Sequence, residues 1–262
     1  MFNALNKAAK KNDDNTVNLK LVIEYDGKNY SGWQRQNKQK SVQQTIEDAL
    51  QVIFRGEKIT LNGSGRTDAG VHAYAQCANF KIDKHVFQSV GLKRLKVSLN
   101  ALVPSDIVIH EIKKAPPGFH ARFSAKKREY IYRFSQRPKA IERDTVYLLK
   151  DSFDINTAKE FCTIITGNHS FRSLCKNKED DHGFRSIVYK AEVKKKKNGI
   201  IEFRISANRF LHSMVRALAG AMIKTAAGKV SLAEFTKNFK KGDEIKIQYV
   251  PSNALFLSKV TY

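Results

Sequence analysis

The chain has 262 residues, of which 42% are hydrophobic and 27% are charged, a balance that excludes an intrinsically disordered protein. Lysine and arginine outnumber aspartate and glutamate by 47 to 25, which gives a formal net charge of +22 and a pI of about 9.9. A field of this sign attracts polyanions, so nucleic acid is the first partner to consider. A lysine-rich composition that serves only solubility is the alternative.

The start of the chain and its cysteines indicate a cytoplasmic protein. Residues 1–16 are polar and rich in lysine, and we expect them to form a disordered basic tail. No apolar run approaches the roughly 20 residues that a membrane span needs. Cys77, Cys162 and Cys175 lie far apart and form no Cys-x-x-Cys pair, so we expect neither disulfides nor a structural zinc site.

The first half of the chain is expected to follow the order β-α-β-β-α-β. Residues 17–25 alternate apolar and polar side chains, which predicts a strand that ends at Asp26-Gly27. Ser41, with Gln44 three residues later, predicts the N-cap of a helix that ends at Gly56. The other expected elements are strands 59–62 and 74–80, helix 86–102 and strand 107–112.

The same order is expected again after residues 115–118, an Ala-Pro-Pro-Gly stretch that is typical of a linker. Asp154 predicts a helix start, and Asn198-Gly199 predicts the turn of a β-hairpin. The expected elements are strand 128–134, helix 154–167, strands 185–194 and 200–207, helix 211–225, a short helix from residue 231, and strand 254–262.

Two βαββαβ patterns without a sequence repeat predict an α+β protein built from two ferredoxin-like halves. We place the first half at residues 17–114 and the second at residues 115–262. Their antiparallel sheets are expected to lie side by side in one broad, mainly antiparallel central sheet. Such a sheet with basic loops resembles the platforms of RNA-binding modules.

Residues 63–73, Gly-Ser-Gly-Arg-Thr-Asp-Ala-Gly-Val-His-Ala, are the most distinctive stretch of the chain. Glycine allows positive φ angles and lets a ligand approach the backbone, so we interpret the stretch as a rigid loop that displays Asp68. Arg66 suits a phosphate or a carboxylate. An ordinary Asp-Ala-Gly turn is the alternative.

Two further residues could act together with this loop. Arg216 lies in a mostly apolar predicted helix, where a charge needs a partner, unless its side chain reaches solvent. Tyr130 could stack on a base or could simply be a core aromatic of its strand. Residues 119–128 alternate aromatic and basic side chains, as a loop that follows phosphates would. The histidines share no spacing of metal ligands, so no metal is expected.

Four ordered motifs make the sequence resemble the tRNA pseudouridine synthase A family over nearly its whole length from Leu19. The motifs are Tyr25-Asp26-Gly27-x-x-Tyr30-x-Gly32-Trp33-Gln34-x-Gln36, Gly65-Arg66-Thr67-Asp68-Ala69-Gly70-Val71-His72-Ala73, Phe119-His120-Ala121-Arg122-Phe123-Ser124-Ala125 with Tyr130-x-Tyr132, and Phe210-Leu211-His212-x-Met214-Val215-Arg216.

The resemblance implies a pseudouridine synthase fold and an enzyme that isomerises uridine to pseudouridine in the anticodon stem-loop of tRNA, at positions 38 to 40. It further implies a homodimer that uses neither a cofactor nor a metal. Asp68 would be the catalytic nucleophile and Arg216 the basic residue paired with it. The residues expected to bind the substrate are Tyr130, Arg66, Thr67, His72 and Arg122.

Two other functions are compatible with the same sequence. A duplicated relative could modify another RNA, such as ribosomal RNA. An RNA-binding or RNA-folding module with secondary catalysis could also use this fold. The sequence leaves open whether Asp68 attacks the ribose or the base.

Overall fold

The computed structural model describes residues 15–176, 183–246 and 248–262, so the predicted basic tail lies outside it except for its last two residues. Thr16 already belongs to the first strand, one residue earlier than predicted. The strands in the described part of the chain are β1 (Thr16–Tyr25), β2 (Asn62–Gly63), β3 (His72–Asp83), β4 (Ile107–Ala115), β5 (Lys127–Ser135), β6 (Tyr147–Leu148), β7 (Gly167–Ser170), β8 (Arg185–Lys195), β9 (Ile201–Ala207) and β10 (Leu255–Thr261). The α-helices described there are α1 (Val42–Ile53), α2 (Lys84–Gln88), α3 (Leu92–Leu102), α4 (Ile155–Ile165), α5 (Met214–Ala226) and α6 (Leu232–Lys241).

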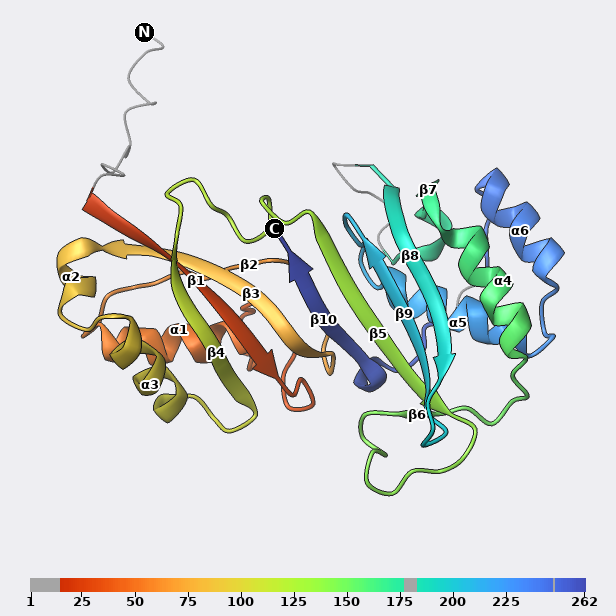
Figure 1. Cartoon of the computed structure of the whole chain (residues 1–262), viewed down its shortest axis with the longest axis horizontal. Helices are drawn as coiled ribbons and strands as arrows, with labels where there is room; N and C mark the ends of the chain where they lie inside the picture. The colour runs from red at the N-terminus through yellow and green to blue at the C-terminus, as the bar shows by residue number, and fades with distance from the viewer. Residues whose placement is uncertain (1–14, 177–182, 247) are drawn as a thin grey trace, which may run out of the picture.

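All described strands join one broad sheet in the order β4-β1-β3-β10-β5-β9-β8-β7, with β2 paired to β3 and β6 to β5 (Figure 1). Every pairing is antiparallel except β3 with β10 and β5 with β6. This confirms the predicted α+β class and the broad, mainly antiparallel sheet. In each βαββαβ unit, the fourth strand lies beside the first, the first beside the third and the third beside the second, as β4-β1-β3-β2 and as β10-β5-β9-β8.

Within this one sheet, the strands of the two units meet where β10 pairs with the start of β3. Only two residue pairs form this parallel ladder, Phe256 with His72 and Leu257 with Ala73. We propose that residues 115–118, which leave β4 and lead toward β5, separate the two halves. The last strand therefore lies at the centre of the molecule, next to the strand that follows the glycine-rich loop.

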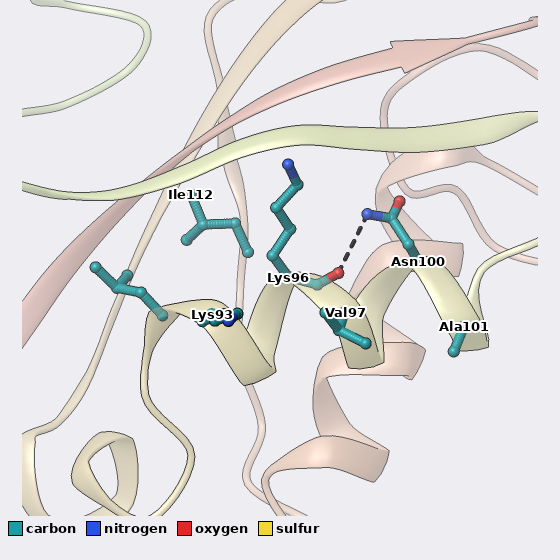
Figure 2. A pocket seen from close by; sticks show the side chains of 7 residues that line it. Lys93, Lys96, Val97, Asn100, Ala101 and Ile112 are labelled. Atoms are coloured by element: carbon teal, nitrogen blue, oxygen red, sulfur yellow. Dashed lines mark hydrogen bonds between the residues drawn. The ribbon is translucent and has the colours of Figure 1, made fainter.

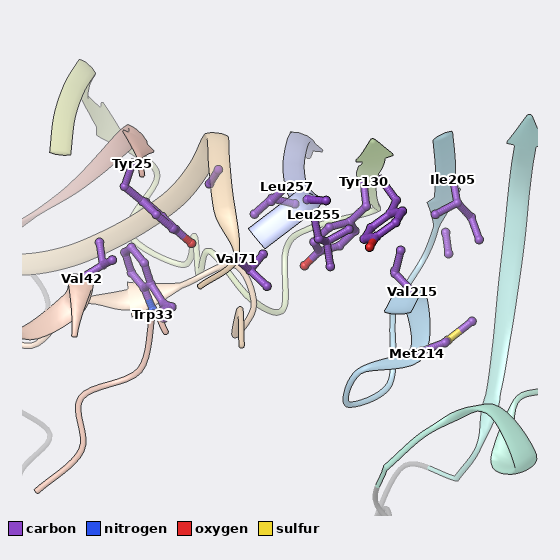
Figure 3. Close-up of a cluster of buried hydrophobic side chains, with 14 of the residues drawn as sticks. Tyr25, Trp33, Val42, Val71, Tyr130, Ile205, Met214, Val215, Leu255 and Leu257 are labelled. Atoms are coloured by element: carbon purple, nitrogen blue, oxygen red, sulfur yellow. The ribbon is translucent and has the colours of Figure 1, made fainter. Parts of the chain in front are cut away.

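The hydrophobic core lies on one face of the sheet. Leu19, Leu21 and Ile23 alternate along β1 and are fully buried, whereas the residues between them are partly exposed. Figure 3 shows side chains of several strands on that same side, together with Val42 of α1 and Val215 of α5. Both halves bury the same face of the sheet, so the helices of both halves lie on that one side.

Several local signals are confirmed at the predicted residues. The Ser41 hydroxyl accepts a hydrogen bond from the Gln44 N–H, and the Asp154 carboxylate accepts from the first turn of α4. Ser231 caps α6 in the same way. Gly199 has a φ of 82° in the turn between β8 and β9. Capping and turn chemistry act within a few residues, so sequence alone could locate these boundaries.

Two predicted helices differ from those observed. The helix expected at residues 86–102 is split into α2 and α3, because Gly91 adopts a φ of 72° and ends the first segment. The helix expected from residue 211 begins only at Met214, because Ser213 adopts left-handed φ and ψ angles of 57° and 13°. Of the strand expected at residues 59–62, only Asn62 is paired.

Candidate active site

The glycine-rich loop joins β2 to β3 and is held by the segment that follows β1. The backbone N–H of Trp33 donates to the Thr67 carbonyl oxygen over 3.2 Å, and the hydroxyl of Tyr25 lies 2.8 Å from the hydroxyl of Thr67. Gly32 has a φ of 95°, and a Cβ there would overlap the Thr67 carbonyl oxygen. These contacts make the loop a fixed scaffold rather than a solvated turn.

Asp68 projects from this loop toward the N-terminus of α5 and meets three of its neighbours. Its Oδ2 accepts a hydrogen bond from the Ser213 hydroxyl over 2.7 Å and one from the Arg216 guanidinium over 3.0 Å. Its Oδ1 lies 3.6 Å from Nε2 of His212. The carboxylate comes from the first half of the chain and its partners from the second, so the site exists only where the halves meet.

Arg216 is held in place from both ends of its guanidinium. Its Nε donates to the Val250 carbonyl oxygen over 2.9 Å, while one terminal nitrogen reaches Asp68. The side chains of Arg216 and Asp68 are 22% and 24% exposed. A partly desolvated ion pair with fixed geometry interacts more strongly than a surface pair. The arginine thus faces a carboxylate, and the predicted alternative in which it reaches solvent does not describe its main contact.

Tyr130 lies on β5, on the buried face of the sheet, close to this pair. Its ring packs edge-on against Phe210 at 87°, with 5.1 Å between ring centroids. Burial raises the pKa of its phenol to about 12, and the charge of Asp68 acts in the same direction. The phenol is therefore neutral at physiological pH, and Tyr130 is both a core aromatic and a neighbour of Asp68.

The other predicted substrate-binding residues occupy different environments. Arg66 and Arg122 are exposed, and neither side chain forms an ion pair with a described residue. Thr67 is buried against Tyr25. His72 is also buried, and its ring stacks on Phe256 with 4.7 Å between centroids.

Both ring nitrogens of His72 lie next to protein atoms. Nδ1 is 3.1 Å from the Gly27 nitrogen and 3.0 Å from Asp26 Oδ1, and Nε2 is 2.9 Å from the Asn253 carbonyl oxygen. His72 thus connects the end of the glycine-rich loop to the turn after β1 and to the segment before β10. Its predicted contact with substrate stays a prediction.

Ser213 and His212 are the neighbours of Asp68 that sequence reasoning did not single out. His212 was visible only as part of a motif. Ser213 gave no signal, because its role depends on a left-handed backbone conformation that a serine rarely adopts. Only the structure shows that the turn into α5 directs both side chains at one carboxylate.

One hollow on the described surface shares no residue with this site. It is an open depression of about 740 Å³ between α3 and β4 (Figure 2). Within the described residues, no three His, Cys, Asp or Glu side chains are placed to hold a metal ion. No helix there is long and apolar enough to cross a membrane.

Comparison with known proteins agrees with the motifs. A family model described as tRNA pseudouridine synthase matches residues 21–124 and 162–262. The tRNA pseudouridine synthase A of Thermodesulfovibrio yellowstonii is 35% identical over 94% of this chain and 100% of that protein. That of Chlorobium phaeobacteroides is 40% identical over 94% and 93%, respectively.

Solved structures give a more distant match. A structure of an H/ACA RNP bound to a substrate RNA containing 2′-deoxyuridine aligns with 79% of this chain, at 13% identity and a TM-score of 0.33. The alignment spans 43% of the matched chain. A Cbf5-Nop10-Gar1 complex aligns with a TM-score of 0.32.

The broad sheet, the loop that carries Asp68 and the matched family model together define a pseudouridine synthase. The chain belongs to the tRNA pseudouridine synthase family. It is an isomerase of the kind that makes pseudouridine in tRNA.

Proposed function

We propose that this protein converts uridine to pseudouridine in the anticodon stem-loop of tRNA, at positions 38 to 40, with Asp68 as the nucleophile. The observation that carries the proposal is the Asp68 carboxylate, held by Arg216 and Ser213 at the junction of the two halves. Family membership supplies the reaction, and the resemblance carried by the four motifs supports the position in tRNA.

The reaction conserves the atoms of the base. The bond from N1 of uracil to C1′ of the ribose breaks, the base turns, and C5 bonds to C1′. The proton on C5 leaves, and N1 gains one. The step therefore calls for a nucleophile and for groups that hold a detached base, which are the roles of Asp68 and its surroundings. Arg216 stabilises the negative charge of the carboxylate by direct ion pairing.

The remaining residues either bind the RNA or hold the loop that carries Asp68. Tyr130 stacks on the uracil, and its neutral phenol suits contact with an uncharged base. Arg66 is exposed two residues before Asp68, where it can hold the phosphate of a nucleotide that has left its stack. Arg122 contacts the RNA backbone, while Thr67 and His72 keep the loop in place.

Tritium release from unmodified tRNA labelled at C5 of uridine tests the proposal. We expect release by the wild type and a loss of roughly 1,000-fold or more in Asp68→Asn. A tRNA with cytidine at positions 38 to 40 should release no tritium. Release by Asp68→Asn would contradict the nucleophile, and release from the altered tRNA would contradict the position. Release only from ribosomal RNA would point to a duplicated relative.

The resemblance also supports a homodimer in the cytoplasm. Cys77 and Cys162 are buried free thiols, as suits a reducing compartment. Sedimentation equilibrium of the purified protein tests the dimer, since a monomer mass at the concentrations used in the assay would contradict it. Fractionation of cells that produce the tagged protein tests the compartment.

A further inference from the structure

Phe123 is the most exposed aromatic side chain in the described part of the chain, with 71% of its surface accessible. Most phenylalanines of this protein are in the core, and burying such a ring stabilises a fold by about 1.5–3 kcal/mol. Because the Phe123 ring is mostly exposed, it contributes little of this free energy to folding. Its position is therefore better explained by something that covers it from outside.

The loop that carries Phe123 is firmly anchored. The Ser124 N–H donates to the His120 carbonyl oxygen over 2.9 Å, and the Ser124 hydroxyl accepts from the His120 N–H. Ala121, which is fully buried, donates its N–H to Asn79 and accepts a hydrogen bond from the Tyr262 hydroxyl. An exposed ring on such a loop is held ready for a partner and loses little entropy on binding.

Two side chains beside Phe123 complete an aromatic and basic surface. The His120 ring lies 4.5 Å from the Phe123 ring, centroid to centroid. The Arg122 guanidinium lies 5.5 Å from the centroid of the Phe123 ring. Aromatic rings beside cations are the combination that binds single-stranded nucleic acid, because the ring stacks on a base and the cation meets its phosphate.

Arg128 ties this surface to the catalytic loop. Its guanidinium donates to the carbonyl oxygens of Arg122 over 2.6 Å and of Ser64 over 2.8 Å. It also reaches the carbonyl oxygen of Asn208, on the segment that leads to α5, over 2.7 Å. The Phe123 loop, the start of the Asp68 loop and the approach to Ser213 thus share one side chain. The exposed ring is fixed relative to the site.

We propose that Phe123, with His120 and Arg122, forms a stacking platform for an unpaired base of the RNA that neighbours the target uridine. The proposal rests on the proposed function, because it needs an RNA whose target nucleotide leaves its stack. That step exposes the faces of adjacent bases, and the Phe123 ring replaces part of the lost stacking. The charge of Arg122 places the platform on the path of the phosphate backbone.

Tryptophan substitution provides a direct reporter, because Trp33 is the only native tryptophan and is buried. In Phe123→Trp, we expect the added fluorescence to be quenched when unmodified tRNA is titrated. Ile141→Trp is the matched control, since Ile141 is 92% exposed in another loop, and its added fluorescence should not change. No quenching in Phe123→Trp, or equal quenching in both variants, would overturn the proposal.

Removal of the ring gives the second measurement. Phe123→Ala should raise the Kd for tRNA by roughly 5- to 150-fold, the range found when base-stacking aromatics are replaced by alanine. Phe123→Tyr should bind as the wild type does. The melting temperature should change little, because the ring is exposed. Unchanged affinity in Phe123→Ala would contradict the platform.

The two proposals fail in distinguishable ways. If the wild type neither binds nor modifies tRNA, the proposed function fails. If the wild type modifies tRNA and Asp68→Asn does not, while Phe123→Ala binds normally, only the platform fails. Asp68→Asn combined with Phe123→Trp measures stacking without turnover, and quenching should persist there.

Discussion

The two oxygens of the Asp68 carboxylate have different surroundings. Oδ2 accepts hydrogen bonds from both Ser213 and Arg216, whereas Oδ1 lies 3.6 Å from His212, beyond hydrogen-bond distance. Engagement of Oδ2 fixes the plane of the carboxylate. If Asp68 is the nucleophile, as proposed above, Oδ1 is the oxygen that is left to attack the substrate, whether at the ribose or at the base.

Ser213 is predicted to be a positioning residue that acts through Asp68. A hydrogen bond to a charged group contributes about 1.5–3 kcal/mol, so Ser213→Gly should lower kcat by roughly 10- to 150-fold and leave KM for tRNA nearly unchanged. Glycine adopts the left-handed angles of this position without strain, so the backbone turn is kept. Single-turnover kinetics with unmodified tRNA measures the effect.

Ser213→Asn is the control for this prediction. Asparagine tolerates the left-handed conformation and offers an N–H donor. It should recover part of the lost rate, with a melting temperature close to that of Ser213→Gly. Full activity in Ser213→Gly would show that the hydroxyl does not position Asp68.

Single residues show where sequence reasoning succeeds at the site. The residues alone left open whether Arg216 meets Asp68 or reaches solvent, and the resemblance implied the pairing. The structure shows the contact, and the catalytic roles of both residues stay predictions. The contacts of Arg128 with three separate segments could not be predicted from the sequence, because its acceptors are backbone carbonyls. Carbonyl groups are present at every residue and leave no mark in the sequence.

At the scale of elements, hydrophobic periodicity and capping residues predicted most of the order of helices and strands. The exceptions depend on backbone angles that residue type allows but does not require. Gly91 divides the helix expected at residues 86–102, whereas a glycine within α5, Gly220, does not interrupt that helix. The strands that pair with β10 could not be predicted from local sequence patterns either, because β10 pairs with strands more than 100 residues earlier in the chain.

Gly220 is predicted to be essential to the packing of α5. A Cβ at this position would overlap the Gln248 carbonyl oxygen, and the adjacent Val250 carbonyl accepts from Arg216. Gly220→Ala should therefore lower the free energy of unfolding by about 1–3 kcal/mol, although alanine in a helix normally adds about 1 kcal/mol over glycine. It should also lower kcat, because the backbone that holds Arg216 is displaced.

Urea denaturation followed by circular dichroism measures the change in stability. Ser98→Ala on α3 is the control, since it raises helix propensity at a half-buried position and adds no atom that could overlap a neighbour. It should leave both stability and activity close to those of the wild type. A Gly220→Ala protein more stable than the wild type would show that the segment around Gln248 moves away at little cost.

At the scale of the molecule, two units with separate helices share one sheet and one site. The parallel ladder between β3 and β10 is short, and the Asp68–Arg216 ion pair bridges the same junction. The pattern of each unit was predictable, because it follows from local periodicity. The register between the two units was not predictable, because it depends on residues far apart in the sequence, such as Phe256 and His72.

The net charge of +22 predicts that tRNA binding weakens steeply with salt. Each phosphate neutralised by a cation contributes roughly 0.7–0.9 to the slope of log Kd against log salt concentration. We expect Arg66→Ala to reduce this slope by about one such step, because Arg66 is exposed and pairs with no described carboxylate. Lys194→Ala should change it little, because Lys194 already pairs with Glu192 at 2.9 Å.

Filter binding of unmodified tRNA between about 50 and 300 mM KCl gives the slopes, and turnover at saturating tRNA should stay constant over that range. Screening acts on long-range attraction and leaves the closely paired carboxylate of Asp68 largely unaffected, so salt should raise KM and not lower kcat. Equal slopes for Arg66→Ala and the wild type would show that Arg66 contacts no phosphate. A fall of kcat with salt would place charge attraction in the chemical step itself.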